Sequence, residues 1–277
     1  MQLSPLGEYT GIEVTGVDVS KPVDAAAVRT LRDALAEYGV IVIRNQAIDD
    51  AKQVEFSRCF GPLERFVRAE HTNVAHPEIM EIADVGDNTK WLSTAQLWHT
   101  DGSYKTVPSY VTTLRAIELP PAGGETWFCN TSAGYEALPD DKKRAIADLN
   151  VVHDLSYSRS LVPNLPPLSP EEREKVPAAV QPLVRLHSGT GRKVLYLGCH
   201  AREIVGMGLE EGRKLLAELE EWTTQPRFVY RHSWQPGDYV IWDNRGTMHR
   251  VTPYDASVYR RLMHRTEVSG EAVRKAA

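Results

Sequence analysis

The pattern of apolar and polar positions predicts two N-terminal helices around one buried strand. Apolar residues recur at helical spacing over residues 24–38, and Gly39 supplies a stop signal. Residues 40–43 then form a continuous apolar run, which is typical of a strand buried on both faces. A second helix is expected over residues 49–59, because a Gly-Pro pair follows it.

Beyond this region the pattern changes to short alternating or β-branched runs that are separated by turns. Helices are expected only over residues 140–149 and 209–222, and no regular strand–helix–strand alternation is visible. The pattern therefore predicts a mainly β fold with flanking helices, an antiparallel sandwich or barrel. No linker interrupts it, so residues 1–277 are expected to form a single domain. The expected strands lie within residues 8–19, 79–82, 110–117, 125–129, 183–186, 194–197, 228–232, 238–242, 249–252 and 260–266.

Two segments look like parts of a binding pocket. Residues 155–182 contain six prolines and an acidic run, which predicts a long irregular excursion. Such segments in compact domains are usually lids or binding loops, so a mobile lid is expected here; the alternative is a disordered surface insertion. Residues 70–96 are loop-like and are expected to form part of the pocket wall.

Composition narrows the class of protein. The net charge of −5 and the scattered Lys and Arg residues argue against nucleic acid as a partner. No apolar run approaches the roughly 18 residues that span a bilayer, and the first residues lack the layout of a signal peptide. Three cysteines far apart argue against a disulfide framework and fit a reducing cytoplasm, where they serve as small buried side chains. The sequence leaves open whether the chain forms a homo-oligomer.

A His-x-Asp pair is the first candidate for chemistry. On an extended strand, residues two apart point to the same face, so His99 and Asp101 could reach one ion. They would be two of the three ligands of the 2-His-1-carboxylate triad that holds non-haem Fe(II). His249, on an expected late strand, is the candidate for the third. His232 and His264 lie on strands too, but each is next to an arginine.

Two arginines follow His249. Arg261 and Arg265 are four apart on an extended segment and hence share a face. Their planar guanidinium groups can hold carboxylates through paired hydrogen bonds. If both side chains point into the fold, bound anions are expected beside them. Solvent-exposed arginines on an edge strand are the alternative.

Together these segments resemble the taurine/2-oxoglutarate dioxygenase family of Fe(II)-dependent oxygenases. The resemblance is carried by residues 98–101, 123–126, 242–245, His249 and 260–265, in the family's order and spacing. It extends from about residue 3 to residue 268. Residues 183–193, 198–201 and 228–232 are similar to the 2,4-dichlorophenoxyacetate dioxygenase branch.

The resemblance implies a fold, cofactors and roles. The fold would be a double-stranded β-helix, or jelly roll, with N-terminal helices packed against it. His99, Asp101 and His249 would ligate Fe(II), and 2-oxoglutarate and O2 would be cosubstrates. Thr126 and Arg261 would hold the distal carboxylate of 2-oxoglutarate. Arg265 matches the position that meets the acidic group of the prime substrate, or the adjacent end of the cosubstrate.

The resemblance leaves alternatives for the role of His200 and for the substrate. His200 matches a histidine linked to substrate recognition, although a structural histidine after a glycine turn is an equal alternative. The implied reaction is hydroxylation, with ether cleavage as one outcome, of a small carboxylate such as an aryloxyalkanoate. A sulfonate, an alkyl sulfate or a biosynthetic metabolite is the second candidate. A metal-binding jelly-roll protein without enzyme activity is the third.

Overall fold

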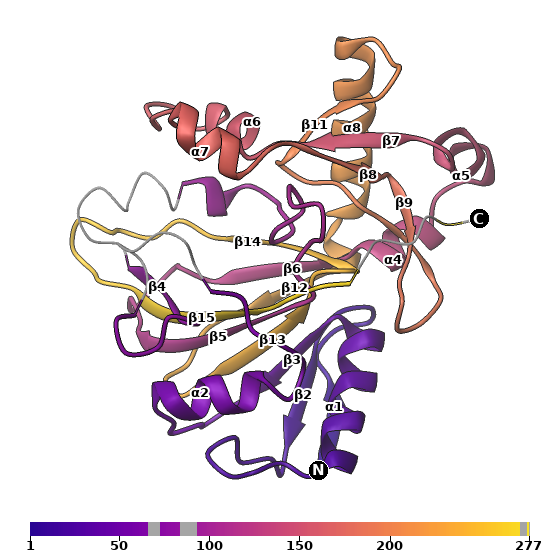
Figure 1. Ribbon diagram of the computed structural model, residues 1–277. Helices are drawn as coiled ribbons and strands as arrows, with labels where there is room; N and C mark the ends of the chain where they lie inside the picture. Colours follow the sequence, from indigo (N-terminus) through magenta and orange to yellow (C-terminus); the bar gives the residue numbers. More distant parts are fainter. Residues whose placement is uncertain (66–72, 84–92, 272–275, 277) are drawn as a thin grey trace.

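Two β-sheets form the layers of the core. The structure is a computed structural model that describes residues 1–65, 73–83, 93–271 and 276. In this part of the chain, the larger sheet has seven strands in the order β1-β2-β3-β13-β5-β15-β4, and a smaller sheet has the order β12-β6-β14 (Figure 1). Apart from the parallel pair β2–β3, neighbouring strands in both sheets are antiparallel. The strand bounds are β1 Gln2–Pro5, β2 Ile12–Thr15, β3 Val40–Ile43, β4 Met80–Ala83, β5 Val111–Glu118, β6 Thr126–Asn130, β12 Val229–His232, β13 Tyr239–Asp243, β14 Thr247–Val251 and β15 Leu262–Val268. The predicted mainly β, jelly-roll fold is confirmed.

The strand β3 shows how the apolar run specifies two packed faces. Val40 and Val42 belong to the core between the sheets, with Phe128 from β6 and Trp242 from β13. Ile41 and Ile43 point to the other face. There they pack with the helices α1 (Ala25–Tyr38) and α2 (Asp50–Ser57). All four residues of β3 are buried, so the prediction of a strand covered on both faces is confirmed.

The predicted ends of α1 are confirmed by its caps. The Asp24 carboxylate accepts a hydrogen bond from the Ala27 amide at 2.8 Å, which satisfies one free N–H of the first turn. Gly39 ends the helix with φ 72°, and its N–H donates to the Leu35 carbonyl.

A third region, rich in short elements, packs against the end of the small sheet. Its core contains Cys129 and Met248 from the small sheet, and Leu216 and Leu219 from its longest helix. The pattern of the sequence missed α4, β7, β8 and β11, which are four to six residues long. The elements of this region are α4 Thr131–Glu136, α5 Asp140–Ile146, β7 Asn150–His153, β8 Ala179–Pro182, β9 Val184–Leu186, β10 Lys193–Leu195, β11 Ala201–Ile204 and α8 Leu209–Thr223.

Residues 155–182 are more regular than expected. They form α6 (Leu155–Ser160), α7 (Pro170–Lys175) and β8, so the expectation of an irregular excursion is wrong. Pro170 occupies the first turn of α7, where a missing N–H costs nothing. The Ser169 hydroxyl and the Glu172 carboxylate complete a capping box at the same end.

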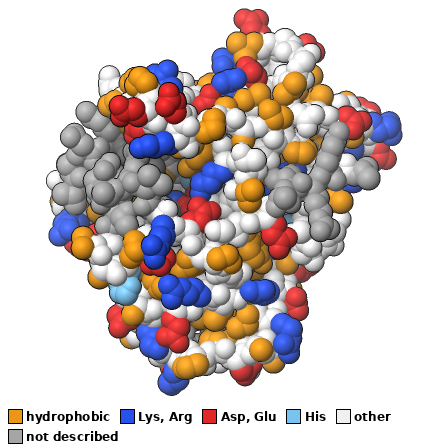
Figure 2. Space-filling view, viewed as in Figure 1, with side chains coloured by type: hydrophobic (Ala, Val, Ile, Leu, Met, Phe, Trp, Pro, Cys, Tyr) orange, Lys and Arg blue, Asp and Glu red, His pale blue; other side chains and the backbone are white. Residues whose placement is uncertain are grey.

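Figure 2 shows acidic and basic side chains interspersed over the visible face of the described residues. Among the described helices, none is long and apolar enough to cross a membrane.

Candidate active site

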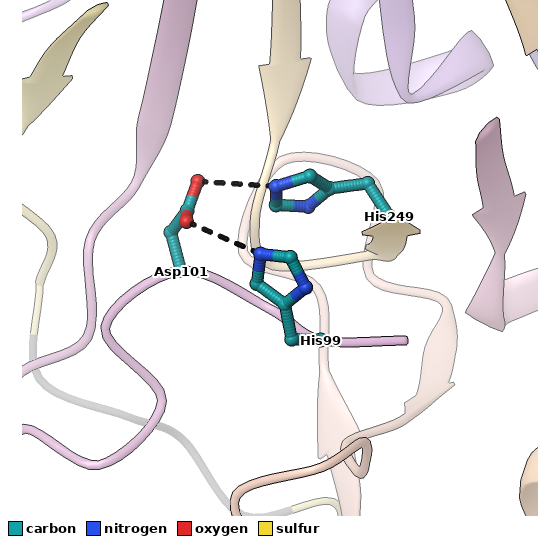
Figure 3. A group of neighbouring side chains, drawn as sticks. All are labelled: His99, Asp101 and His249. Carbon is teal, nitrogen blue, oxygen red and sulfur yellow. Dashed lines mark ion pairs between the residues drawn. The ribbon is translucent and has the colours of Figure 1, made fainter. Parts of the chain in front are cut away.

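His99, Asp101 and His249 converge in one wall of a pocket (Figure 3). The Nε2 atoms of His99 and His249 lie 3.9 and 3.7 Å from the two oxygens of Asp101. These separations are too long for hydrogen bonds. One ligand atom from each residue can be chosen so that all three lie within 4.8 Å of one another. The predicted triad is therefore brought together in space.

Backbone pairing places the two histidines side by side. His99 and His249 form an isolated antiparallel bridge, with both amides donating to the opposite carbonyl at 3.0 and 2.8 Å. Residues paired in this way project to the same face. The expectation that His99 and Asp101 lie on one extended strand is wrong, because His99 forms only this isolated bridge and Asp101 begins a turn. Asp101 reaches the site from that turn and not by strand alternation.

The protonation states suit a divalent cation. Burial lowers the pKa of His249 to about 3, with His99 adding to the effect, and burial also lowers the pKa of His99. Burial opposes ionisation of Asp101, yet Arg265 and the two histidines hold the pKa of its carboxyl well below its usual range. His99 donates Nδ1–H to the Leu97 carbonyl at 2.8 Å, so its Nε2 lone pair faces Asp101. Two neutral imidazoles and one carboxylate are thus ready to bind a metal ion.

Asp101 is also held by neutral partners. Thr112 on β5 donates its hydroxyl to Asp101 Oδ2 at 2.7 Å and accepts from the Asn244 amide at 2.9 Å. The Asn244 side-chain oxygen accepts from the Asp101 backbone N–H at 3.3 Å. Hydrogen bonds of this kind to a carboxylate orient it for binding a metal ion.

A chain of charges continues from Asp101 through Arg265. Arg265 donates Nη1–H to Asp101 Oδ1 at 3.2 Å and pairs with Glu267 through Nη2. Glu267 in turn accepts from Ser109 at 2.7 Å and lies 3.2 Å from the Lys105 ammonium. Arg265 lines the pocket, as predicted, but two carboxylates already contact it. Glu267 is not among the residues predicted for the site, although its position two residues after Arg265 is a signal for a shared face.

Thr126 and Arg261 line the same pocket as the triad. Arg261 is only 5% exposed, so the alternative of a solvent-exposed arginine is wrong for it. Its side chain packs against Gly124, where a Cβ would lie 3.2 Å from Arg261 Cδ. Thr126 begins β6, and its hydroxyl accepts from the Trp234 indole at 3.0 Å. The pocket therefore has a metal triad and a cation with a neighbouring hydroxyl on its wall.

His200 also lines the pocket. It lies in the segment that connects β10 to β11. Its Nδ1 bonds the Ser158 hydroxyl of α6 at 2.9 Å, and its ring lies edge-on to Tyr104 and His99. Burial lowers the pKa of His200 well below its usual value. Ser158 and its neighbour Arg159, which also lines the pocket, are not among the predicted site residues.

The other candidate histidines are occupied elsewhere. His232 lies 3.0 Å from Asp238, and His264 lies 2.7 Å from Asp50. Neither belongs to a metal-type cluster among the described residues. Of the three candidates, His249 is therefore the histidine that the structure brings to His99 and Asp101.

Residues 70–96, which are expected to form part of the pocket wall, belong only in part to the described residues. Ile82, Thr94 and Ala95 line the pocket. Residues 70–72 and 84–92 lie outside the described residues.

A jelly roll whose pocket carries a His-x-Asp…His triad beside a buried arginine defines a metal-dependent oxygenase. The chain belongs to the taurine catabolism dioxygenase TauD, TfdA family, whose model matches residues 2–266. It is an Fe(II)- and 2-oxoglutarate-dependent dioxygenase, with O2 as the second cosubstrate. The alternative of a non-enzymatic metal-binding protein is therefore set aside.

Similar proteins span nearly the whole chain. One is the alpha-ketoglutarate-dependent 2,4-dichlorophenoxyacetate dioxygenase of Burkholderia sp. (strain RASC), 37% identical over 92% of this chain and 90% of that protein. Another is the (S)-phenoxypropionate/alpha-ketoglutarate-dioxygenase of Sphingobium herbicidovorans, 34% identical over 99% of this chain and 97% of that protein. The crystal structure of AAD-2 in complex with Mn(II) and N-oxalylglycine has a TM-score of 0.86 and 35% identity, covering 100% of this chain and 99% of the other.

Proposed function

We propose that this enzyme hydroxylates a small organic carboxylate, of which an aryloxyalkanoate is the best candidate, and that His99, Asp101 and His249 hold its Fe(II). The observation that supports the metal assignment is the convergence of two neutral imidazoles and one ionised carboxylate on one pocket wall. Three protein ligands on one face of the ion leave positions for cosubstrate and O2.

Arg261 and Thr126 bind the distal carboxylate of 2-oxoglutarate in this proposal. A buried guanidinium presents a rigid fork that matches a carboxylate, and the Thr126 hydroxyl can add a third hydrogen bond. Arg265 faces the acidic group of the prime substrate or the adjoining end of the cosubstrate. His200 contributes to the wall that the prime substrate contacts.

Fe(II) held by His99, Asp101 and His249 would, together with 2-oxoglutarate and O2, supply the oxidant for a substrate C–H bond, and 2-oxoglutarate would become succinate and CO2. The protein orients the reactants and keeps the pocket dry. Leu114, Leu155 and Val251 provide apolar lining for this purpose. With an aryloxyalkanoate, hydroxylation beside the ether oxygen gives a hemiacetal that collapses to a phenol and an oxo acid.

The proposal also covers the domain organisation of the chain and its cellular location. Residues 1–277 act as one dioxygenase domain, with residues 155–182 as a lid over the pocket. Leu155 and Arg159 from α6 line the cavity, which supports a covering role for this segment. A cytoplasmic location accords with three free cysteines.

A sulfonate, an alkyl sulfate or a biosynthetic metabolite remains the alternative substrate. Arg265 would meet a sulfur oxyanion as readily as a carboxylate, since a guanidinium donates to either.

Two measurements test the proposal. Anaerobic addition of Fe(II) and 2-oxoglutarate should give the weak visible charge-transfer band of the chelate. After O2 is admitted, succinate release should be stimulated by aryloxyalkanoates in a panel that also contains sulfonates and alkyl sulfates. Stimulation by sulfur oxyanions alone would overturn the carboxylate assignment, and intact protein without the band would overturn the metal assignment.

A further inference from the structure

A second cavity lies apart from the pocket of the metal triad. Its volume is about 540 Å³, which is within the range of pockets that hold small organic ligands. Three elements contribute to its wall: the helix α1 through Arg32, the strand β9 through Arg185, and the turn between β13 and β14 through Asn244 and Arg245. Among the described residues, none lines both this cavity and the triad pocket. The proposed reaction therefore does not account for this space.

Arg185 is a buried cation in the wall of the second cavity. The residue is only 6% exposed, and its guanidinium carbon lies 3.8 Å from the centre of the Tyr196 ring. The buried Nη1 atom has no hydrogen-bond partner, and no carboxylate in the described part of the chain pairs with this guanidinium. An aromatic ring attracts a cation but does not neutralise its charge. Burial of a charge without an opposite charge beside it is strongly unfavourable.

The polar groups beside Arg185 are neutral. The rings of His153 and Tyr196 lie 5.3 Å apart. Burial and the charge of Arg185 lower the pKa of His153 to about 3, so its imidazole is uncharged near neutral pH. His153 Nε2 and the Tyr196 hydroxyl are, like Arg185 Nη1, buried without a hydrogen-bond partner in the described residues. The local charge is therefore positive, and an anion is the group that balances it.

The remaining charged residues of the wall also favour an anion. Arg245 is paired with the buried Asp243 at 2.5 Å, so its charge is compensated. Arg32 donates to a backbone carbonyl at 2.6 Å, which orients the side chain but carries no charge. Glu271 is the one carboxylate among the described lining residues, and it is exposed. Arg185 and Arg32 thus make the wall more basic than acidic.

The cavity borders residues that hold the metal ligand Asp101. Asn244 lines the cavity, accepts from the Asp101 amide at 3.3 Å and donates to Thr112 at 2.9 Å. Ser109 also lines the cavity and donates to Glu267 at 2.7 Å. A ligand in this cavity therefore contacts side chains that belong to the hydrogen-bond network of the metal site.

We propose that the second cavity is a binding site for a small organic anion, whose carboxylate or phosphate group pairs with Arg185 while Arg32 contacts it from α1. Either group matches the planar fork of a guanidinium through two parallel hydrogen bonds. The Ser188 hydroxyl accepts from Arg245 at 2.7 Å and can donate its own proton to a further oxygen of the anion. The site is separate from the reaction pocket, so the inference does not depend on which substrate the enzyme oxidises.

Calorimetry on the loaded enzyme tests the inference. Mn(II) and N-oxalylglycine occupy the reaction pocket, and the probes are succinate, inorganic phosphate and the uncharged succinamide. At least one of the two anions should bind, whereas succinamide should not. Arg185→Met should weaken that anion by at least about tenfold, because a buried charge-assisted contact is lost. Arg32→Met removes an exposed contact and should weaken the anion by about two- to tenfold.

Thermal unfolding separates an anion-binding arginine from a merely structural one. The anion that binds should raise the Tm of the wild type and of the control variant Arg227→Met, but not that of Arg185→Met. Without the anion, Arg185→Met should be no less stable than the wild type, since it removes an unpaired buried charge. Arg227 is a matched control because it also stacks on an aromatic ring, that of Phe228 at 4.5 Å, and does not line the cavity.

The outcomes distinguish the two kinds of anion. Binding of succinate alone identifies an organic carboxylate as the ligand class, and binding of phosphate alone identifies a phosphate group. Equal affinities in Arg185→Met and Arg227→Met would overturn the inference, as would binding of neither anion or equal binding of succinamide. If Arg185→Met does not fold, Arg32→Met decides the question, and an unchanged affinity in that variant contradicts the proposed site.

Discussion

Arg260 and Arg261 are neighbours in sequence with opposite environments. The Arg260 side chain is 62% exposed and lies 3.8 Å from Glu118, while Arg261 is buried in the pocket wall. A surface ion pair of this kind contributes little, whereas a buried charge-assisted contact contributes about 1.5–3 kcal/mol. Replacing Arg260 and Arg261 one at a time therefore distinguishes loss of a cosubstrate contact from the general effect of removing one positive charge.

Arg261→Ala should raise the apparent KM for 2-oxoglutarate by about 10- to 150-fold, because the variant loses that buried contact. Steady-state succinate release at varied 2-oxoglutarate measures the change. Arg260→Ala is the control and should leave the KM within twofold. An unchanged KM in Arg261→Ala would assign the carboxylate contact to another residue.

Thr112 and Thr113 offer a second matched pair, on opposite faces of β5. Thr112 contacts Asp101, while Thr113 bonds Thr266 and Tyr239 at 2.8 and 2.9 Å on the far side of the sheet. Both are fully buried. Their replacement by valine removes one hydroxyl at similar volume in each case.

Thr112→Val should weaken Mn(II) binding about 10- to 100-fold, because Asp101 loses a contact that orients it. Thr113→Val should leave the Mn(II) affinity unchanged, while both variants lose about 1 kcal/mol of unfolding free energy. Electron paramagnetic resonance of free Mn(II) and urea unfolding give the two quantities. Equal Mn(II) affinities in the two variants would show that Thr112 has only a structural role.

At the scale of elements, the turn before β11 approaches the backbone of the metal site. Gly198 has φ 111°, and a Cβ there would lie 3.0 Å from the Trp98 carbonyl oxygen and 3.1 Å from His99 Cα. The Cys199 amide donates to the same carbonyl at 2.7 Å. This turn therefore helps to position His99 without supplying a ligand.

Gly198→Ala should cost about 1–3 kcal/mol of stability from the left-handed backbone and should also weaken Mn(II) binding by about tenfold. Gly206→Ala separates the two effects, because Gly206 has φ 80° and nothing within 4 Å of its Cβ position. Gly206→Ala should lower the stability of the protein without weakening Mn(II) binding. Thermal unfolding and Mn(II) titration measure both changes, and unchanged metal affinity in Gly198→Ala would contradict the positioning role.

The sequence was sufficient where local pattern decides the structure. The apolar run at β3 and the cap residues Asp24 and Gly39 predicted their elements, because burial and backbone conformation act locally there. His99 and Asp101 were recognisable from spacing and resemblance. The actual geometry at Asp101 is a turn, which strand periodicity could not predict.

Tertiary packing decided what the sequence could not show. Short elements such as α6 and β11 have too few residues for a periodic pattern. Arg159 lines the pocket from α6, which contacts β11 through Asp154 and α8 through Tyr157. Likewise, β15 begins at Leu262 and shifts register against β5 between Leu262 and Met263, so strand alternation alone could not fix the direction of Arg261.

For the whole molecule, the metal site connects the two sheets. His249 belongs to β14 of the small sheet, whereas Asp101 is held by Thr112 and Arg265 of the large sheet. A cation bound by this triad therefore links both layers, and unfolding must break the site. A ligand that binds the folded state alone stabilises it in proportion to the logarithm of its concentration.

Mn(II) at 100 times its dissociation constant should stabilise the protein by about 2.7 kcal/mol, which corresponds to a rise in Tm of about 4–5 °C for a chain of this size. Thermal unfolding under argon, with and without Mn(II), measures the rise, and a chelator should reverse it. His249→Ala should abolish the rise at the same Mn(II) concentration because the triad loses one ligand. His232→Ala removes a histidine of the same sheet that pairs with Asp238 away from the triad. It should lower the Tm of the metal-free protein but preserve the rise. A rise that survives in His249→Ala would place the metal elsewhere in the molecule.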